Sequence, residues 1–333
     1  MSVRVGIVGV GNIGEDHAHR LAERTRGAEV AAIADVDAAR AEAVARAVGA
    51  QACPTDLLVG RDDVDAVVVT TTGAHHEPYV LAAIAARKPV FCEKPLATTV
   101  DACQRIVAAE AATGRRLVQV GFMRRFDPDY LAVRRAIADG RIGRPLLVHC
   151  VHRNAASGPG LTSASIVLDS AVHEIDQVRW LLGEEVAAAR VLAPRPTPRV
   201  EPGVQDPMVV VLEMASGAMV LDELFVNAGY GYDVRCEVVG ETGAVALPDP
   251  GAVVVRKNGH RGRAVPPDWR ERFRAAYDAE LQAWVDAVAA GQGGTGPTAH
   301  DGLAATAVAE ACIRALESGQ RAPVRLPFAG TSV

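Results

Sequence analysis

Lysine, paired cysteines and long apolar runs are all scarce in this sequence of 333 residues. Of its 35 basic residues only Lys88, Lys94 and Lys257 are lysine, so a chain that otherwise uses arginine keeps lysine at particular places. No apolar run approaches the about 18 residues of a membrane span, and no signal peptide precedes the first apolar segment. We therefore expect a soluble, cytoplasmic protein that makes no membrane contact.

The six cysteines lie far apart, without a C-x-x-C pair or a cluster with histidine. This spacing argues against a metal site and against a disulfide scaffold. The net charge of -5 is mild, and no basic run is interleaved with aromatic residues, so nothing indicates nucleic-acid binding. A chain of this length predicts about two domains.

The N-terminal stretch predicts a strand, a helix and a second strand that closes on Asp35. The apolar run Val3–Val8 leads into the motif Gly9-x-Gly11-x-x-Gly14. In such a motif the first glycine allows a tight turn, the second lets the backbone approach a pyrophosphate, and the third brings the helix close to the strand. The following helix N-terminus attracts phosphates. The stretch is typical of a dinucleotide-binding Rossmann unit.

Asp35 lies 21 residues beyond Gly14, where a carboxylate can accept hydrogen bonds from both hydroxyls of the adenosine ribose. A 2'-phosphate would be repelled there, and the nearest downstream cation, Arg40, falls inside the next predicted helix. We therefore predict NAD as the cofactor rather than NADP.

Two later strands of this domain end in residues that could do chemistry. The run 65–70 closes on Thr70-Thr71-Thr72-Gly73, which either borders the nicotinamide or is an ordinary turn. The run 90–92 closes on Glu93-Lys94-Pro95. A primary amine at this edge of the sheet could hydrogen-bond a substrate oxygen, although a lysine at a turn is more often simply solvated. Proline makes a cis bond feasible there.

The composition changes after Gly121, and alternating apolar residues then indicate an open, mainly antiparallel sheet with helices. The fold class is thus α/β plus α+β: a Rossmann domain over residues 1–121 and an α+β domain over residues 122–333. The predicted strands of the second domain are 146–153, 208–214, 218–226, 233–239, 244–247 and 253–255.

Asp169 and His173 lie in a predicted helix that ends at Gly183, and their spacing places them on one face. A carboxylate beside an imidazole can orient it and raise its basicity, which gives a proton acceptor near neutral pH. A simple pair on the helix surface would have the same spacing.

Taken together, these stretches resemble the Gfo/Idh/MocA family of nicotinamide oxidoreductases, and in particular its inositol-oxidising members. The resemblance covers residues 3–319. It rests on the glycine motif and on Phe91-Cys-Glu-Lys-Pro-Leu, Gly121-Phe-Met-Arg-Arg-Phe-Asp127, His152-Arg-Asn154, Asp169-x-x-x-His173-Glu-Ile-Asp176, Tyr230-Gly-Tyr-Asp233 and Gly296-Pro-Thr-Ala-His-Asp301.

The resemblance implies NAD-dependent oxidation of a secondary hydroxyl of myo-inositol without a metal, in a homotetramer that assembles through the open sheet. His173 would take the hydroxyl proton, Lys94 would hydrogen-bond the reacting oxygen, and Asp169 would support the histidine. The polyol pocket would be lined by Arg124, His152, Asn154, Asp169, Ser170, His173 and Tyr232. The cofactor would be bound by Gly9, Gly11, Asn12, Ile13, Gly14, Asp35, Thr70, Thr71, His76, Glu93 and Lys94.

Other functions fit the same motifs. The substrate could be scyllo-inositol, chiro-inositol or glucose, or the reaction could run as reduction of a keto-cyclitol. Ser170 and the loop 155–165 border the pocket and depart from the family pattern, so they bear on the choice of polyol. A non-catalytic sugar or dinucleotide sensor is a further alternative, which the set Lys94, Asp169 and His173 disfavours.

Overall fold

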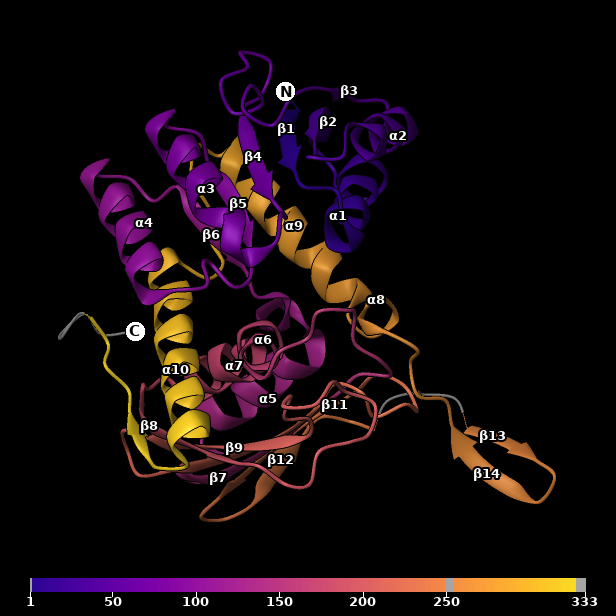
Figure 1. Ribbon diagram of the computed structural model, residues 1–333, viewed down its shortest axis with the longest axis vertical. Helices are drawn as coiled ribbons and strands as arrows, with labels where there is room; N and C mark the ends of the chain where they lie inside the picture. Colours follow the sequence, from indigo (N-terminus) through magenta and orange to yellow (C-terminus); the bar gives the residue numbers. More distant parts are fainter. Residues whose placement is uncertain (1, 250–253, 328–333) are drawn as a thin grey trace. The chain divides into compact units, whose positions relative to one another are not determined.

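The computed structural model describes residues 2–249 and 254–327, which divide into two compact units (Figure 1). The N-terminal unit comprises the chain up to Met123 together with Ala276–Thr306, and the C-terminal unit comprises Arg124–Ala275 and the chain from Ala307 onward. The division expected from the sequence, at residues 121 and 122, left 276–306 in the second domain. That segment groups with the first because its helix packs into the first core.

The N-terminal unit contains a six-stranded parallel sheet in the order β3-β2-β1-β4-β5-β6. Strands β4 and β5 are buried along their whole length, as expected where helices cover both faces of a sheet. This is the predicted Rossmann architecture. The strands are β1 Val3–Val8, β2 Ala28–Ala34, β3 Gln51–Ala52, β4 Ala66–Val69, β5 Val90–Glu93 and β6 Val118–Gly121.

Local capping chemistry marks the start of two helices of this unit. The Asp37 side chain accepts the Arg40 amide at 3.1 Å to start α2, and Gly49 ends α2 in the left-handed conformation. Thr99 caps α4 in the same way. The helical segments are α1 Asn12–Glu23, α2 Ala38–Val48, η1 Gly73–His75, α3 His76–Ala85, α4 Val100–Ala112 and α9 Arg274–Ala289.

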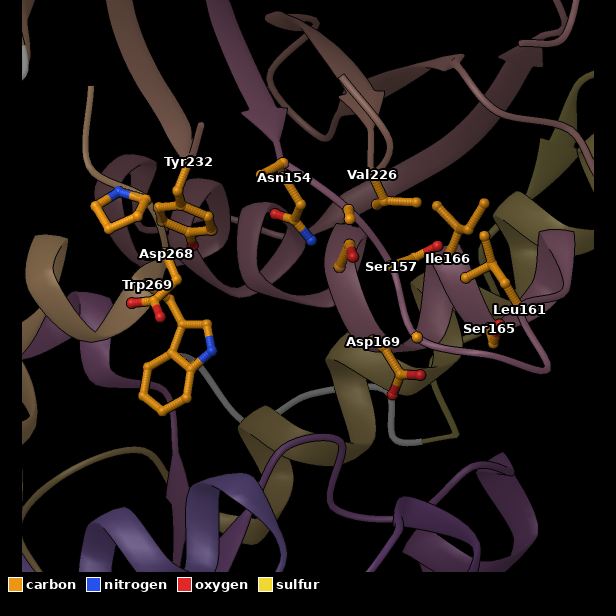
Figure 2. A pocket seen from close by; sticks show the side chains of 15 residues that line it. Asn154, Ser157, Leu161, Ser165, Ile166, Asp169, Val226, Tyr232, Asp268 and Trp269 are labelled. Carbon is orange, nitrogen blue, oxygen red and sulfur yellow. The ribbon is translucent and has the colours of Figure 1, made fainter. Parts of the chain in front are cut away.

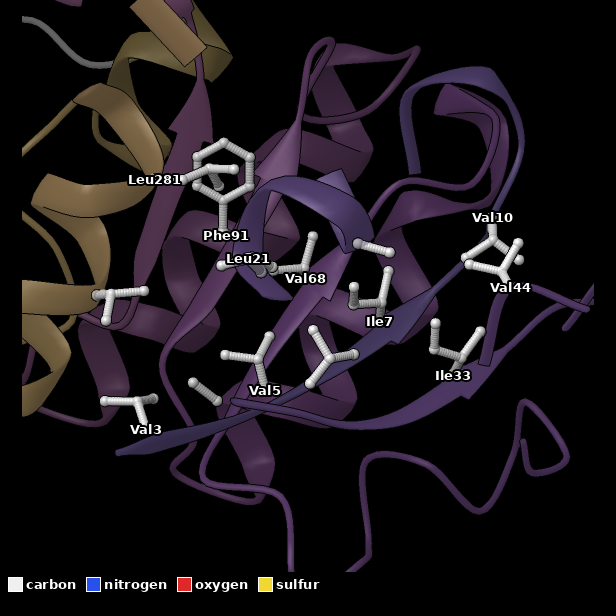
Figure 3. Packing of buried hydrophobic residues seen from close by; sticks show 14 of the residues in the cluster. Val3, Val5, Ile7, Val10, Leu21, Ile33, Val44, Val68, Phe91 and Leu281 are labelled. Atoms are coloured by element: carbon white, nitrogen blue, oxygen red, sulfur yellow. The ribbon is translucent and has the colours of Figure 1, made fainter. Parts of the chain in front are cut away.

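The core of the N-terminal unit joins the sheet to α1 and to α9 (Figure 3). Leu281 and Trp284 of α9 are fully buried, and the Trp284 ring meets the edge of Phe91 on β5 at 5.8 Å between centroids. Leu21 of α1 belongs to the same cluster. A helix far along the chain therefore completes the core beside the strand that carries Glu93.

The C-terminal unit contains a seven-stranded sheet in the order β12-β11-β7-β10-β9-β8-β15. Its neighbouring strands are antiparallel except for β7 and β10, which run parallel. The open, mainly antiparallel sheet is therefore confirmed. The strands are β7 Pro145–Arg153, β8 Val186–Leu192, β9 Met208–Met214, β10 Met219–Phe225, β11 Asp233–Gly240, β12 Ala244–Ala246 and β15 Ala322–Pro323.

Alternate residues of this sheet face opposite sides, as the pattern of burial shows. One face is covered by helices of the same unit, with α5 packed on α7 (Figure 1). A separate hairpin of β13 Val254–Lys257 and β14 His260–Arg263 extends from the unit. The remaining helical segments are η2 Met123–Phe126, α5 Pro128–Ala138, α6 Ser163–Ile166, η3 Val167–Ala171, α7 Val172–Leu182, α8 Trp269–Arg272 and α10 Ala299–Ser318.

Several elements differ from the sequence prediction. Strands β3, β8 and β14 were not expected, and residue 253, where a strand was expected to start, lies outside the described residues. The helix predicted around Asp169 begins as the π-helical turn η3 before α7 continues. None of the described helices combines the length and the apolar character that crossing a membrane requires.

Candidate active site

The glycine loop after β1 has the geometry that a dinucleotide needs. Gly9 has φ +89°, and a Cβ added there would lie 2.6 Å from the Thr71 amide nitrogen. A Cβ on Gly14 would collide with the Gly9 carbonyl oxygen, whereas one on Gly11 would meet nothing within 4 Å. Two glycines thus permit the turn and the close helix, and the third leaves its backbone open to a phosphate. The loop fits NAD.

Asp35 follows directly after β2 and is half-buried. Its carboxylate accepts the amide of Val10 at 2.7 Å and the amide of Asp37 at 2.9 Å. The first of these bonds fixes the side chain against the glycine loop. A carboxylate has further lone pairs beyond these two, so it can still accept from ribose hydroxyls.

The residues predicted near the nicotinamide make internal contacts. The Thr70 hydroxyl donates to the Gly9 carbonyl at 2.6 Å. The His76 ring is buried, with Nδ1 2.8 Å from the Pro95 carbonyl and Nε2 2.9 Å from the Thr71 carbonyl. Burial lowers the pKa of His76. These bonds link the turns after β4 and β5, while Asn12 stays exposed and Ile13 half-buried. Cofactor contact by these residues remains a prediction.

Glu93 and Lys94 stand at the end of β5, and the peptide bond between Lys94 and Pro95 is cis. Lys94 is half-buried. The Glu93 carboxylate turns inward: it lies 2.9 Å from Nε2 of His17 and accepts the Lys94 amide at 3.1 Å. Glu93 therefore serves the turn around Lys94, whatever it contributes to the cofactor.

In the C-terminal unit a buried polar network surrounds Arg124. Its guanidinium donates to Glu174 Oε1 and, at 2.8 Å, to Gln177 Oε1. The second Glu174 oxygen lies 3.0 Å from Nδ1 of His152. Because a carboxylate can only accept, Nδ1 carries a proton, and in the neutral form of the ring Nε2 of His152 is then an acceptor.

Charge pairing decides the ionisation of this network. Burial by itself would raise the pKa of Glu174, but Arg124 and His152 outweigh burial and lower it. Arg124 keeps its charge because the Glu174 carboxylate opposes the effect of burial on its pKa. The network is therefore a buried ion pair of Arg124 and Glu174, and the same carboxylate orients the His152 ring.

His173 and Tyr232 extend the network through ring contacts. The His152 ring lies 6.1 Å from His173 and 5.8 Å from Tyr232 between centroids. Burial raises the pKa of Tyr232 to about 12, so its hydroxyl stays protonated and can donate. Both histidines and the tyrosine are buried. Four predicted substrate residues, Arg124, His152, His173 and Tyr232, are thus brought together.

A pocket of about 350 Å³ opens beside this group, within the same unit. Figure 2 shows Asn154 and Tyr232 on one side of the pocket and Asp169 on another. The Oδ1 atom of Asn154 has no hydrogen-bond partner among the described residues. Of the predicted substrate residues, Asn154, Asp169, Ser170 and Tyr232 line the pocket, whereas Arg124, His152 and His173 are not part of its lining.

The loop 155–165 forms part of the pocket wall and is tied to the sheet. Ser157 donates to Asn227 Oδ1 from both its amide and its hydroxyl, at 3.0 Å each. Asn227 in turn donates to Asp206 at 2.9 Å. The loop that departs from the family pattern is therefore held by buried side chains outside it.

Sequence reasoning missed several residues of these sites. Glu174 and Gln177 orient Arg124, and the only signal for them was their place beside His173 on the same helix. Asp268 and Trp269 line the pocket from the start of α8 and lie in no quoted motif. His17 contacts Glu93 from within the first helix, where it looks like any other residue of an amphipathic pattern.

Two family models match the chain, an oxidoreductase NAD-binding Rossmann fold over residues 3–122 and an oxidoreductase C-terminal alpha/beta domain over residues 134–326. The chain belongs to the Gfo/Idh/MocA family of oxidoreductases. It is 52% identical to inositol 2-dehydrogenase 3 of Saccharopolyspora erythraea, over 98% of this chain and 96% of that protein. The family and the fold expected from the sequence are confirmed.

Other similar proteins are named for more than one inositol isomer. A Shouchella clausii protein named inositol 2-dehydrogenase/D-chiro-inositol 3-dehydrogenase is 47% identical, over 98% of this chain and 95% of its own length. The crystal structure of Lactobacillus casei myo-inositol dehydrogenase with NAD(H) and myo-inositol superposes with a TM-score of 0.95 at 37% identity, covering 99% of this chain and 98% of that one.

Proposed function

We propose that this family member oxidises myo-inositol to its 2-keto derivative with NAD. The pocket carries the proposal: Asn154, Asp169, Ser170 and Tyr232 offer hydroxyl, amide and carboxylate groups to a ligand whose ring bears only hydroxyls. The relatives named as inositol dehydrogenases support the same substrate class.

When bound, NAD supplies the hydride acceptor. The protein's own groups handle the proton and the developing charge. His173 accepts the hydroxyl proton, and Asp169, four residues earlier in the η3 turn, supports it. Lys94 donates a hydrogen bond to the reacting oxygen. The ion pair of Arg124 and Glu174 keeps Nε2 of His152 free to accept from a hydroxyl.

The direct test is the initial rate of NADH formation with myo-inositol, scyllo-inositol, D-chiro-inositol and glucose, each with NAD and with NADP. We expect NAD-linked oxidation of myo-inositol and slow reaction with NADP, because Asp35 repels a 2'-phosphate. Oxidation of only another polyol would mean that this polyol is the substrate and that Ser170 and the loop 155–165 set the specificity. Tight binding without turnover would instead favour the sensor.

We also propose that the chain forms a homotetramer through the uncovered face of the C-terminal sheet. Leu221 lies in the central strand β10 on that face and is 37% exposed, beside Val211 of β9 and His149 of β7. An exposed apolar sheet face of this kind is usually an interface.

Replacing Leu221 with glutamate should dissociate the tetramer, because a charge would have to be buried in the interface. The matched control is Leu57→Glu, which changes an exposed leucine of the N-terminal unit. Sedimentation velocity would measure both. A wild-type protein that sediments as a monomer contradicts this assembly.

A further inference from the structure

A buried histidine of α1 contacts the acid that precedes Lys94. His17 is fully buried, and its Nε2 lies 2.9 Å from Oε1 of Glu93, whose side chain is only 6% exposed. Both residues belong to the N-terminal unit. Both side chains are therefore held by the packing of this unit.

The second oxygen of Glu93 is engaged on the backbone of the next residue. Oε2 accepts the amide of Lys94 at 3.1 Å. A Cβ at Gly121, which pairs with Glu93 across the sheet, would lie 3.0 Å from the carboxylate, so the glycine makes room for it. The carboxylate thus connects His17 to the backbone from which the Lys94 side chain departs.

The surroundings of His17 define which ring nitrogen donates. Phe91 and Tyr277 meet the imidazole edge-on at 5.7 and 5.6 Å between centroids, and Nδ1 has no hydrogen-bond partner among the described residues. Because the carboxylate can only accept, Nε2 carries the proton. Burying Nδ1 without a hydrogen-bond partner costs free energy of folding, and the bond from Nε2 to Glu93 offsets part of that cost.

We infer that His17 is a positioning residue for the reaction: it holds Glu93, and Glu93 sets the turn that presents Lys94. The inference rests on the proposed function, since it assumes that Lys94 hydrogen-bonds the reacting oxygen. His17 itself touches neither substrate nor cofactor in this account.

The test replaces His17 with phenylalanine, which keeps a ring but cannot donate, and with glutamine, whose Nε2 can still reach Glu93. We expect His17→Phe to lower kcat by about 10- to 100-fold, as small displacements of catalytic groups do, with the NAD dissociation constant changed less than about threefold. His17→Gln should recover most of kcat. His19→Phe, on the exposed side of α1, is the matched control.

The same change in a Lys94→Met background separates positioning from general damage. If His17 acts through Lys94, the two residues are fully coupled, so His17→Phe should change the residual kcat/KM of Lys94→Met less than about twofold. A persistent 10- to 100-fold loss in that background would overturn the inference, because the damage would not pass through the lysine. Wild-type kcat in His17→Phe would overturn it as well.

Failure of the proposed function gives a different result. Full turnover by Lys94→Met would remove the role of the lysine and with it the role of His17. An inactive Lys94→Met beside a fully active His17→Phe would remove only the role of His17.

Where His17→Phe does not fold, His17→Asn replaces it, because asparagine is one methylene shorter than glutamine and loses the contact. Equal kcat in His17→Asn and His17→Gln would then count against positioning.

Discussion

Replacing His173 with asparagine should lower kcat for myo-inositol oxidation by about 10²- to 10⁴-fold, the usual contribution of a general base. His173 is buried at the start of α7, in ring contact with His152 of the polar network. Without it the hydroxyl loses the proton acceptor that the proposed mechanism assigns to it. The residual rate should rise with pH, because hydroxide then takes over part of the proton transfer. Steady-state kinetics across a pH series would measure both effects.

The controls for this prediction lie in both units. His260→Asn changes an exposed histidine of β14 and should leave kcat as in the wild type. The NAD dissociation constant of His173→Asn should stay close to that of the wild type, because the glycine loop and Asp35 belong to the N-terminal unit. Asp169→Asn should also lower kcat while sparing NAD binding. Wild-type turnover in His173→Asn would remove the histidine from the mechanism.

Much of the N-terminal unit could be predicted from the sequence because its turns and helix starts depend on residues close together in the chain. The three glycines and Asp35 fix a strand, a turn and a helix within one short stretch. Helices α2 and α4 begin where the side chains of Asp37 and Thr99 accept backbone amides, and such capping depends only on residues close in the sequence. Where a residue type satisfies a backbone group nearby, prediction needs no knowledge of the rest of the fold.

Distant pairing accounts for what the sequence did not reveal. Strand β8 carries three successive alanines, which suit a helix equally well, and only its pairing with β9 makes it a strand. No residue pattern around Asp169 distinguishes a π-helical turn from an ordinary α-helical one. Leu281 enters the N-terminal core from a segment far along the chain, and no local pattern reports such a contact.

The candidate site shows the same limit. Asn154, Asp169, Ser170 and Tyr232 were expected at the pocket and line it. Arg124 was expected to line it too, yet its guanidinium is committed to Glu174 and Gln177 inside the protein. Residue type indicates that a group is functional, but the partners that occupy its donors appear only when the strands and helices are assembled.

Removing the charge of Glu174 should have the largest effect on stability. Glu174→Gln leaves Arg124 buried without a counter-charge, and breaking a buried pair in this way costs about 3–5 kcal/mol. Both side chains are nearly inaccessible, at 2% and 1% exposure. Urea unfolding should therefore show a clearly lower midpoint. The matched control is Glu241→Gln, which breaks the exposed pair with Arg144 and should leave the unfolding midpoint close to that of the wild type.

The pH dependence of unfolding provides a second measure of Glu174. Its pKa is lowered in the folded protein from an ordinary value of 4.5. The folded state therefore binds fewer protons than the unfolded state near that pH, so the carboxylate stabilises the fold above pH 4.5 and this contribution is lost as the pH falls through the lowered value. Glu174→Gln should lack this part of the acid sensitivity, whereas Glu241→Gln should keep it.

A double replacement distinguishes the two consequences of the ion pair. Arg124→Met with Glu174→Met removes both charges and keeps similar volume, so it should regain most of the stability lost by Glu174→Gln. It should not regain activity, because Nδ1 of His152 would no longer donate to a carboxylate and the tautomer with Nε2 as acceptor would lose its support. Recovery of both stability and kcat would mean that the network serves only the fold. Recovery of stability alone would mean that the buried ion pair is needed for activity, through its effect on the orientation of the His152 ring.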